Sequence, residues 1–284
     1  MSVEAPERQL GTPIKGPAAI GVDLHRFVNL TRTLAVTEFK LRFFGSALGY
    51  LWQLMRPLLL FGVLYVVFTN VLKFRSTAAF YPVALLSGIV MFVFLSETTG
   101  GAVTSLVDRE NLVRKVQFPR LVVPLSVVTT GLMNLALNIV VVLVFLLISG
   151  GSVRLSWLEI PFLMTALALF SASLSTLLSA LYVRYRDVKP VWEVLLQMLF
   201  YGTPIFYTLN VIPNETLRKL LLLNPLAVVI QQFRHAVIDP SHPSAARAAG
   251  GWTLLLAPAA ILIALTVFGY RYFDREAPRI AEDL

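Results

Sequence analysis

The chain has 284 residues, of which 57% are hydrophobic and only 14% are charged, and its formal net charge is +8. Soluble globular domains carry about a quarter charged residues, so this composition excludes an ordinary soluble protein and indicates an all-α membrane protein with several spans. The chain has no cysteine, which excludes disulfides, thiolate metal sites and cysteine nucleophiles.

The N-terminal part of the chain is polar. Residues 1–22 mix proline, glycine and charges, and they are predicted to form a disordered cytosolic tail, not a cleavable signal. In 23–50, apolar and basic residues alternate at mostly helical spacings, which predicts an amphipathic helix in the inner membrane interface, capped by Asp23. Gly45 and Gly49 then allow the chain to turn into the membrane.

Apolar runs predict six transmembrane helices, most of them about 20 residues or longer. The predicted spans are 51–72, 81–107, 121–148, 157–183, 191–207 and 252–273. Segment 217–238 is also apolar, but Asn224 and Pro225 interrupt it, so it is predicted to be a re-entrant outer helical hairpin between spans five and six. Most lysine and arginine residues then fall on the cytoplasmic side, which places both termini in the cytoplasm.

Among the polar residues inside the predicted spans, one acid and two asparagines are candidates for a functional role. Glu97, in span two, is either a functional acid or a group that faces the helix bundle and is hydrated from the cytosol. Asn134 and Asn138 lie one turn apart in span three, where they either bind a neighbouring helix or line a path for sugars.

A basic loop separates spans two and three. Its sequence, DRENLVRKVQFPR at 108–120, contains four cations, which places it in the cytoplasm. Its apolar residues lie among charges, as in a short amphipathic helix that docks a cytosolic partner, or in a solvated loop held to lipid headgroups. The positive charge of such loops suits contact with anionic membrane lipids and gives no reason to expect nucleic-acid binding.

No motif for catalysis or nucleotide binding is recognisable. Gly11 and Gly16 have the spacing of a phosphate-binding loop, but Pro17 and Ala18 follow them in place of Lys and Ser or Thr. The three histidines form no HExxH motif, and no nucleophile has a neighbouring base. We therefore expect no catalytic residue, no metal site and no cofactor in this chain.

Five motifs, taken in order, resemble the membrane subunit of ABC-2 type polysaccharide exporters, the permeases for O-antigen, capsule and teichoic acid. They are FKLRFFGSALGYLWQLMRPLLLFGVLYVVFTNVL at 39–72, ENLVRKVQFPR at 110–120, RYRDV at 184–188, GTPIFY at 202–207 and LNPLAVVIQQFR at 223–234. The resemblance covers nearly the whole chain after residue 24. It implies that residues 51–284 form an ABC-2 type transmembrane domain.

The resemblance implies a homodimer in the cytoplasmic (inner) membrane, joined to two copies of a cytosolic ABC ATPase that holds ATP and Mg²⁺. Closure of the ATPase would move the spans through a coupling helix. The substrate would be an O-antigen-like or teichoic-acid-like polysaccharide on an undecaprenyl carrier, passed out through a channel. The alternatives are a permease of the same type for a small drug or lipid, and a membrane enzyme of glycolipid metabolism.

The resemblance also implies candidate site residues. The coupling segment comprises Glu110, Asn111, Leu112, Val113, Arg114, Lys115, Val116, Phe118, Pro119 and Arg120. Aromatic rings can stack on sugars, and the candidates for lining the channel are Tyr65, Phe68, Tyr81, Phe200, Tyr201, Phe206 and Tyr207. Arginine suits phosphate, so Arg56, Arg184 and Arg186 are candidates for binding the headgroup at the inner mouth. The alternatives are the aromatic belt of the membrane interface for the rings and positive-inside anchoring for the arginines.

Overall fold

The structure, a computed structural model, describes residues 19–20, 23–43, 49–71, 80–116, 118–209 and 212–280, and these contain helices and loops but no strand. The predicted all-α class is thereby confirmed. In chain order the helices are α1 (Leu24–Phe43), α2 (Gly49–Val66), η1 (Val67–Val71), α3 (Tyr81–Asp108), α4 (Glu110–Lys115), α5 (Val122–Ile148), η2 (Leu155–Glu159), α6 (Ile160–Arg184), α7 (Val188–Gly202), α8 (Glu215–Leu221), α9 (Pro225–Phe233), η4 (Arg234–Ile238), α10 (Ala245–Ala249), η5 (Trp252–Leu255) and α11 (Leu256–Glu276).

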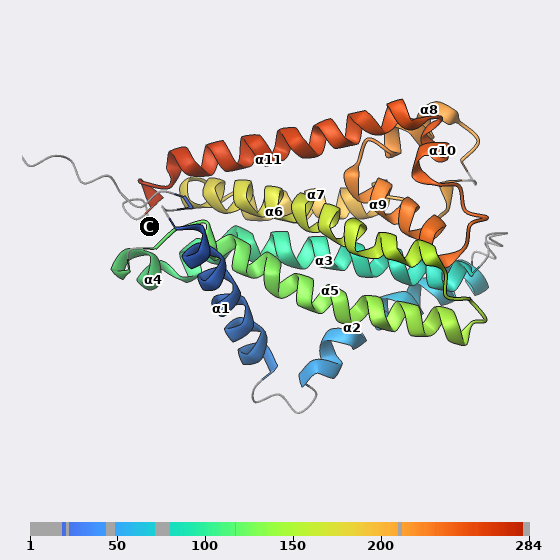
Figure 1. Cartoon of the computed structure of the whole chain (residues 1–284), viewed down its shortest axis with the longest axis horizontal. Helices are drawn as coiled ribbons and strands as arrows, with labels where there is room; N and C mark the ends of the chain where they lie inside the picture. Colours follow the sequence, from blue (N-terminus) through green and yellow to red (C-terminus); the bar gives the residue numbers. More distant parts are fainter. Residues whose placement is uncertain are drawn as a thin grey trace, which may run out of the picture.

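Four long helices, α3, α5, α6 and α11, lie side by side and give the molecule its length (Figure 1). The short helix α4 and the end of α11 lie at one end of this bundle, and α8 and α10 lie at the other. We call these the α4 end and the α10 end. Helix α3 is central, because it contacts α2, α5, α6, α7 and α9.

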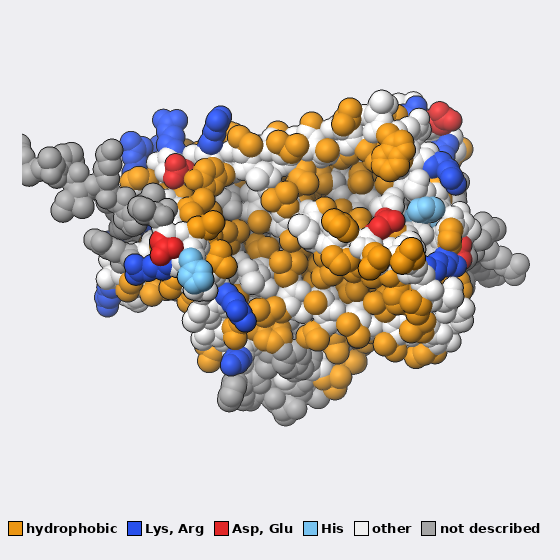
Figure 2. Space-filling model, viewed as in Figure 1, with side chains coloured by type: hydrophobic (Ala, Val, Ile, Leu, Met, Phe, Trp, Pro, Cys, Tyr) orange, Lys and Arg blue, Asp and Glu red, His pale blue; other side chains and the backbone are white. Residues whose placement is uncertain are grey.

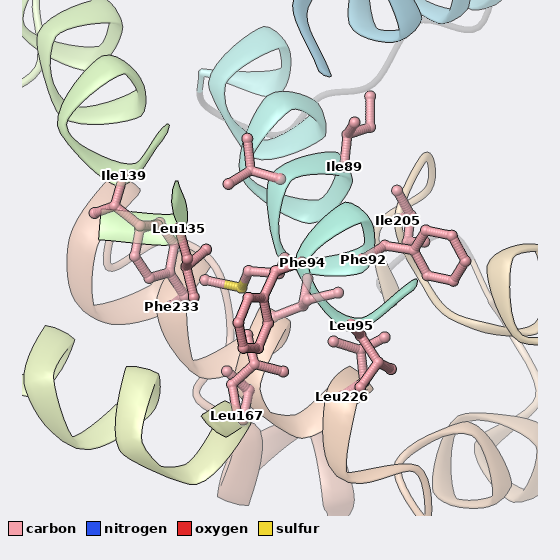
Figure 3. Packing of buried hydrophobic residues seen from close by; sticks show 14 of the residues in the cluster. Ile89, Phe92, Phe94, Leu95, Leu135, Ile139, Leu167, Ile205, Leu226 and Phe233 are labelled. Carbon is pink, nitrogen blue, oxygen red and sulfur yellow. The ribbon is translucent and has the colours of Figure 1, made fainter. Parts of the chain in front are cut away.

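The main core forms around α3. Leu85, Ile89 and Leu95 of this helix are completely buried. Figure 3 shows Ile89 and Leu95 in the same cluster as Leu167 of α6 and Leu226 of α9. Because these side chains have packing partners on all sides, dispersion contacts hold the neighbouring helices to α3.

The close approach of α3 and α5 depends on a glycine. A Cβ atom added at Gly131 of α5 would overlap the methyl group of Thr98 in α3, and it would also lie 3.3 Å from the ring of Phe94. Small residues at such positions let membrane helices pack closely, and dispersion contacts between the helices then stabilise the pair.

Within the described residues, five helical segments are long and apolar enough to cross a membrane, and they correspond to five of the six predicted spans. They are Leu51–Val71, Tyr81–Asp108, Val122–Ile148, Leu155–Arg184 and Trp252–Glu276. The apolar pair Glu215–Leu221 and Pro225–Ile238 is bent by 103°, which is compatible with either a broken span or a re-entrant loop. The bend lies at Asn224, whose side chain accepts a hydrogen bond from Leu226 N at 3.0 Å and so begins α9.

The predicted fifth span has two parts. Helix α7 has 15 residues, and a non-helical, bent segment at 203–207 follows it; because its backbone begins extended at Thr203, we call it the extended segment. The Trp192 indole donates to Thr99 Oγ1 at 3.0 Å, near the α4 end of α3, while the Tyr81 hydroxyl donates to Phe206 O at 2.8 Å, at the opposite end. The two parts together therefore run antiparallel to α3 along nearly its whole length.

A buried arginine holds the extended segment in place. Arg234, which is 1% exposed, donates to Ile205 O at 2.7 Å, to Tyr207 O at 3.2 Å and to Ala84 O at 3.3 Å. Ile205 and Tyr207 lie in irregular backbone, where a buried carbonyl without a donor is costly. For these two carbonyl groups, Arg234 supplies hydrogen bonds that a regular helix would have supplied itself.

Helix α1 crosses the α4 end of the bundle obliquely (Figure 1). The Asp23 carboxylate accepts a hydrogen bond from Arg26 N at 3.2 Å, which confirms the predicted cap. The helix packs on α5, where the Thr130 hydroxyl donates to Ala35 O at 3.2 Å. Residues 1–18 of the predicted tail and the predicted turn at Gly45 lie outside the described residues, whereas Ala19 is buried at the α4 end.

Candidate functional site

A groove of about 690 Å³ lies between α2, α3 and α7. Its lining combines aromatic, aliphatic and polar side chains: Leu60, Phe92, Ser96, Glu193, Leu196, Gln197, Phe200 and Tyr201. A volume of this size, with mainly apolar walls and a few polar groups, is typical of a site for an organic ligand.

An aromatic cluster beside the groove brings together five of the seven predicted channel residues, of which Phe200 and Tyr201 line the groove itself. Ring centroids lie 4.9 Å apart for Phe92 and Phe200, 5.3 Å apart for Phe200 and Tyr201, and 5.1 Å apart for Phe68 and Phe206. Phe206 also lies 5.1 Å from Tyr207. The rings thus form a continuous cluster that joins η1, α3, α7 and the extended segment.

Two predicted channel aromatics are placed differently from the others. Tyr65 stacks on Phe61 of its own helix, with 5.6 Å between the centroids. Tyr81 is buried, and its hydroxyl is used in the hydrogen bond to the backbone of the extended segment. Neither residue lines the groove.

The polar edge of the groove was missed by sequence reasoning. Glu193 and Gln197 lie one turn apart on α7, both exposed, and Ser96 of α3 lines the same groove. A signal for them existed, because Glu193 is the one acid in the otherwise largely apolar helix α7. Carboxylate, amide and hydroxyl groups can all bind sugar hydroxyls.

A second polar cluster joins α2 to α3 and α5. Arg56 forms an ion pair with Glu97 at 2.7 Å, and Gln53 donates to the same carboxylate at 2.9 Å. Gln53 and Glu97 line a small cavity of about 20 Å³ together with Asn134 and Asn138. Glu97 is therefore a paired, bundle-facing acid, and Arg56, a predicted headgroup ligand, already has a carboxylate partner.

The other two predicted headgroup arginines lie at the α4 end of α6. Arg184 lies 5.5 Å from the ring centroid of Tyr185, and Arg186 lies 5.1 Å from that of Tyr182, as in cation–π pairs. Arg184 lines an open pocket of about 400 Å³, to which Arg56 does not contribute. The structure therefore separates Arg56 from Arg184 and Arg186.

The predicted coupling segment has an exposed face and a buried face. Helix α4 is stabilised by an ion pair between Glu110 and Arg114 at 2.6 Å. The exposed residues are Asn111, Arg114, Lys115 and Val116, whereas Val113, Phe118 and Arg120 are buried and Glu110, Leu112 and Pro119 are partly buried. The exposed residues form the face that is available to another protein.

The buried face rests on a cluster that we call the α4-end core. Its members are Ala19, Phe27, Leu106, Val113, Phe118, Leu121, Val122, Val123, Ala180, Val183, Phe273, Ala277 and Ile280. Arg109, just before α4, forms an ion pair with Glu38 of α1 and donates to Ser126 Oγ of α5 at 3.1 Å. Burial lowers the pKa of the Arg109 guanidinium. Through Val113, helix α4 thus joins a core that also contains residues of α1, α3, α5, α6 and α11.

Charge is concentrated at the ends of the molecule. Figure 2 shows lysine and arginine side chains gathered mainly around the α4 end, whereas the long middle of this face is mostly hydrophobic. Within the part of the chain that the structure describes, no three His, Asp or Glu side chains lie close enough together to hold a metal ion.

Comparison with known proteins gives consistent matches over most of the chain. A family model described as "ABC-2 type transporter" matches residues 29–238. An O-antigen export system permease protein RfbA of Myxococcus xanthus is 29% identical over 263 residues, which cover 92% of this chain and 98% of the relative. A protein of the same name from Klebsiella pneumoniae is 29% identical over 252 residues, covering 87% and 92%. The polysialic acid transport protein KpsM of Escherichia coli is 23% identical over 210 residues, covering 72% and 80%.

Proposed function

The chain belongs to the ABC-2 type transporter family, and we propose that it is the membrane subunit of an ATP-driven exporter that carries a lipid-linked polysaccharide across the cytoplasmic membrane. A separate cytosolic ABC ATPase, which binds ATP and Mg²⁺, supplies the energy. The O-antigen permeases among its relatives support a polymer of the O-antigen type.

The groove between α2, α3 and α7 is the observation that carries this proposal. Flat aromatic rings such as Phe200 and Tyr201 offer apolar faces on which sugar rings stack. Glu193, Gln197 and Ser96 offer hydrogen-bonding groups for the hydroxyls at the edges of those rings. A small apolar drug has few groups that could form hydrogen bonds with this polar edge, so the edge favours a polysaccharide substrate over a drug.

The inner mouth of this path lies at the α4 end. Arg184 and Arg186 are exposed there, and their guanidinium groups suit the pyrophosphate of a lipid carrier. The polymer would enter from the cytoplasmic leaflet beside these residues and continue along α7 into the groove.

Coupling to the ATPase follows from the two faces of α4. The exposed residues Arg114 and Lys115 would contact the ATPase, while Val113 transmits the displacement into the α4-end core. That core joins helix α4 to the ends of the long helices, and close-packed contacts transmit displacement because they are nearly incompressible. Movement of α4 would therefore reach the spans that border the groove.

The membrane arrangement has six spans, with α7 and the extended segment after it as the fifth. Both termini and α4 then lie in the cytoplasm, in agreement with the concentration of basic residues. A homodimer would place two such subunits around one path. Cysteine placed at the exposed Thr216 in α8 tests the topology: an impermeant thiol reagent should label it in intact cells, and labelling only after lysis contradicts six spans.

Transport of the proposed substrate can be measured directly. The permease should co-purify with the ABC ATPase encoded nearest to its gene, and the complex in proteoliposomes should move a fluorescent lipid-linked oligosaccharide only when ATP is present. A permease that purifies alone and modifies the glycolipid chemically would instead support the enzyme alternative.

The coupling surface has a matched control within the chain. Reversing Arg114 and Lys115 to Glu should reduce ATP-driven transport at least about tenfold, because each reversal replaces an attractive contact with a repulsive one. The same reversal at Arg218 and Lys219, in α8 at the α10 end, should leave ATPase binding unchanged. Normal transport by the R114E/K115E variant would remove the coupling role of α4.

A further inference from the structure

The lining of the groove carries negative charge and no positive charge. Among the eight lining residues, Glu193 carries the one formal charge, and none is a lysine or arginine. Glu193 forms no ion pair or hydrogen bond with any residue that the structure describes. The nearby cation of α2, Arg56, is already paired with Glu97. An exposed and unpaired carboxylate therefore faces the space in which the polymer would lie.

Family membership alone leaves the charge of the polymer open. From the groove we infer that the exported glycan is uncharged along its length, and that Glu193 is the residue that selects it over a polyanionic chain. This inference rests on the proposed function, because it concerns the substrate of the same groove.

Hydrogen bonding favours the uncharged chain. A sugar hydroxyl can donate to the Glu193 carboxylate, and hydrogen bonds to an ionised acceptor are roughly twice as strong as neutral ones. Gln197, one turn further along α7, adds an amide that can donate and accept. The rings of Phe200 and Tyr201, which meet edge to face, offer apolar faces that need no charge on the sugar.

Electrostatic repulsion disfavours the charged chain. A glycan with a carboxylate on each sugar would bring an anion next to Glu193 with no cation among the lining residues to compensate. The surrounding helices and lipid lower the local dielectric constant, so the repulsion is screened less than it would be in water. A homodimer would present this carboxylate twice and so increase the preference for an uncharged glycan over a polyanionic one.

The inner mouth differs from the groove in the sign of its charge. Arg184, Arg186 and Lys189 are exposed where α6 ends and α7 begins, which suits the anionic headgroup of the carrier. A substrate with one anionic end and a neutral chain matches both regions. A polyanion matches the mouth alone.

The test compares two probes on the whole complex of permease and ATPase in lipid nanodiscs. Both probes are polyprenyl pyrophosphates with sugar chains of equal length, one built of neutral hexoses and the other of hexuronic acids. The measured quantity is the probe concentration that gives half-maximal stimulation of ATP hydrolysis. We expect the wild-type complex to respond to the neutral probe at a concentration about tenfold lower.

Two variants and one control assign the selectivity to a single residue. E193Q should reduce the tenfold preference to less than about threefold, and E193K should reverse it. Glu193 has no partner among the described residues, so the melting temperature of E193Q should match that of the wild type. E215Q, at another exposed acid, which pairs with Lys219 in α8 at the α10 end, should keep the full preference.

The possible results separate this inference from the function on which it rests. Equal responses of the wild type to both probes, or an undiminished preference in E193Q, overturn the inference and leave the exporter intact. Failure of both probes to stimulate the complex removes the proposed function, and the inference with it.

Discussion

Helices α2 and α3 are neighbours with the same mean hydropathy, yet their environments differ completely. In the most apolar part of α3, 78% of the residues are buried inside the subunit, whereas the corresponding share in α2 is 6%. Hydropathy therefore shows that both segments belong in a membrane and does not show which one forms the core.

The difference lies in small and hydroxyl-bearing side chains. On α3, Ser87, Thr98 and Thr99 are buried, and Gly88 lies against the backbone of Ile205. Such residues let neighbouring helices approach on several sides. Helix α2 instead carries large aliphatic and aromatic residues around most of its circumference. It is joined to the bundle mainly along one side, where Arg56 and Gln53 bind Glu97.

The largest expected effect comes from truncating the core of α3. Leu95 is completely buried, and Leu95→Ala should reduce the free energy of unfolding by about 2–5 kcal/mol, because it leaves a cavity among packed helices. Unfolding in detergent micelles, followed by circular dichroism, measures this loss. Leu95→Met nearly conserves volume and should cost less than about 1.5 kcal/mol. Equal losses for the two variants would mean that the site is not close-packed.

A smaller loss should follow from removing the arginine that holds α3 to the extended segment. Arg234→Met leaves the carbonyl groups of Ile205 and Tyr207 without the guanidinium donor, whereas Ala84 O keeps its hydrogen bond from the Ser87 hydroxyl. The expected loss is about 1–3 kcal/mol in the same unfolding measurement. Arg247→Met, an exposed arginine of α10, is the control and should be neutral. A neutral result at Arg234 would show that water or lipid headgroups can replace the guanidinium.

Much of this architecture could be predicted from local sequence. The spans at α3, α5, α6 and α11 follow from long apolar runs, and the break before α9 follows from Asn224 and Pro225. Both signals act within a few residues, because hydrophobic length and the missing proline N–H are local properties.

The pairings across the bundle could not be predicted. Arg56 and Glu97 are 41 residues apart, and no local rule joins them, since the contact depends on how α2 is placed against α3. The same limit applies to the predicted coupling segment, where the amphipathic pattern does not reveal that Val113 and Phe118 pack into this subunit's own core. For the groove, the sequence indicated the aromatic residues as a group. Glu193 could be identified as a lining residue only from the position of α7 in the fold.

The polar contact between α2 and α3 should contribute little stability. Polar contacts between membrane helices contribute about 0.6 kcal/mol on average. Because the Arg56 side chain is 69% exposed and that of Glu97 is 23% exposed, solvent screens the pair and should hold its coupling energy within about 1 kcal/mol. A double-mutant cycle with Arg56→Gln and Glu97→Gln measures this energy. A coupling energy above about 2 kcal/mol would make the pair a main anchor of α2.

The smallest effect is expected on the outward face of α2. Leu59 is 52% exposed, so within a single subunit Leu59→Ala should change the free energy of unfolding by less than about 0.5 kcal/mol. In a membrane this face meets either lipid or a second subunit. If lipid covers this face, Leu59→Ala should barely change stability, because lipid chains are as apolar as leucine. If a second subunit covers it, the substitution should remove packing contacts between the subunits. Measuring the dimer fraction of Leu59→Ala in detergent separates the two cases. An unchanged dimer fraction assigns this face of α2 to lipid. A reduced dimer fraction means that the second subunit packs against α2, just as the other helices of the same subunit pack against α3.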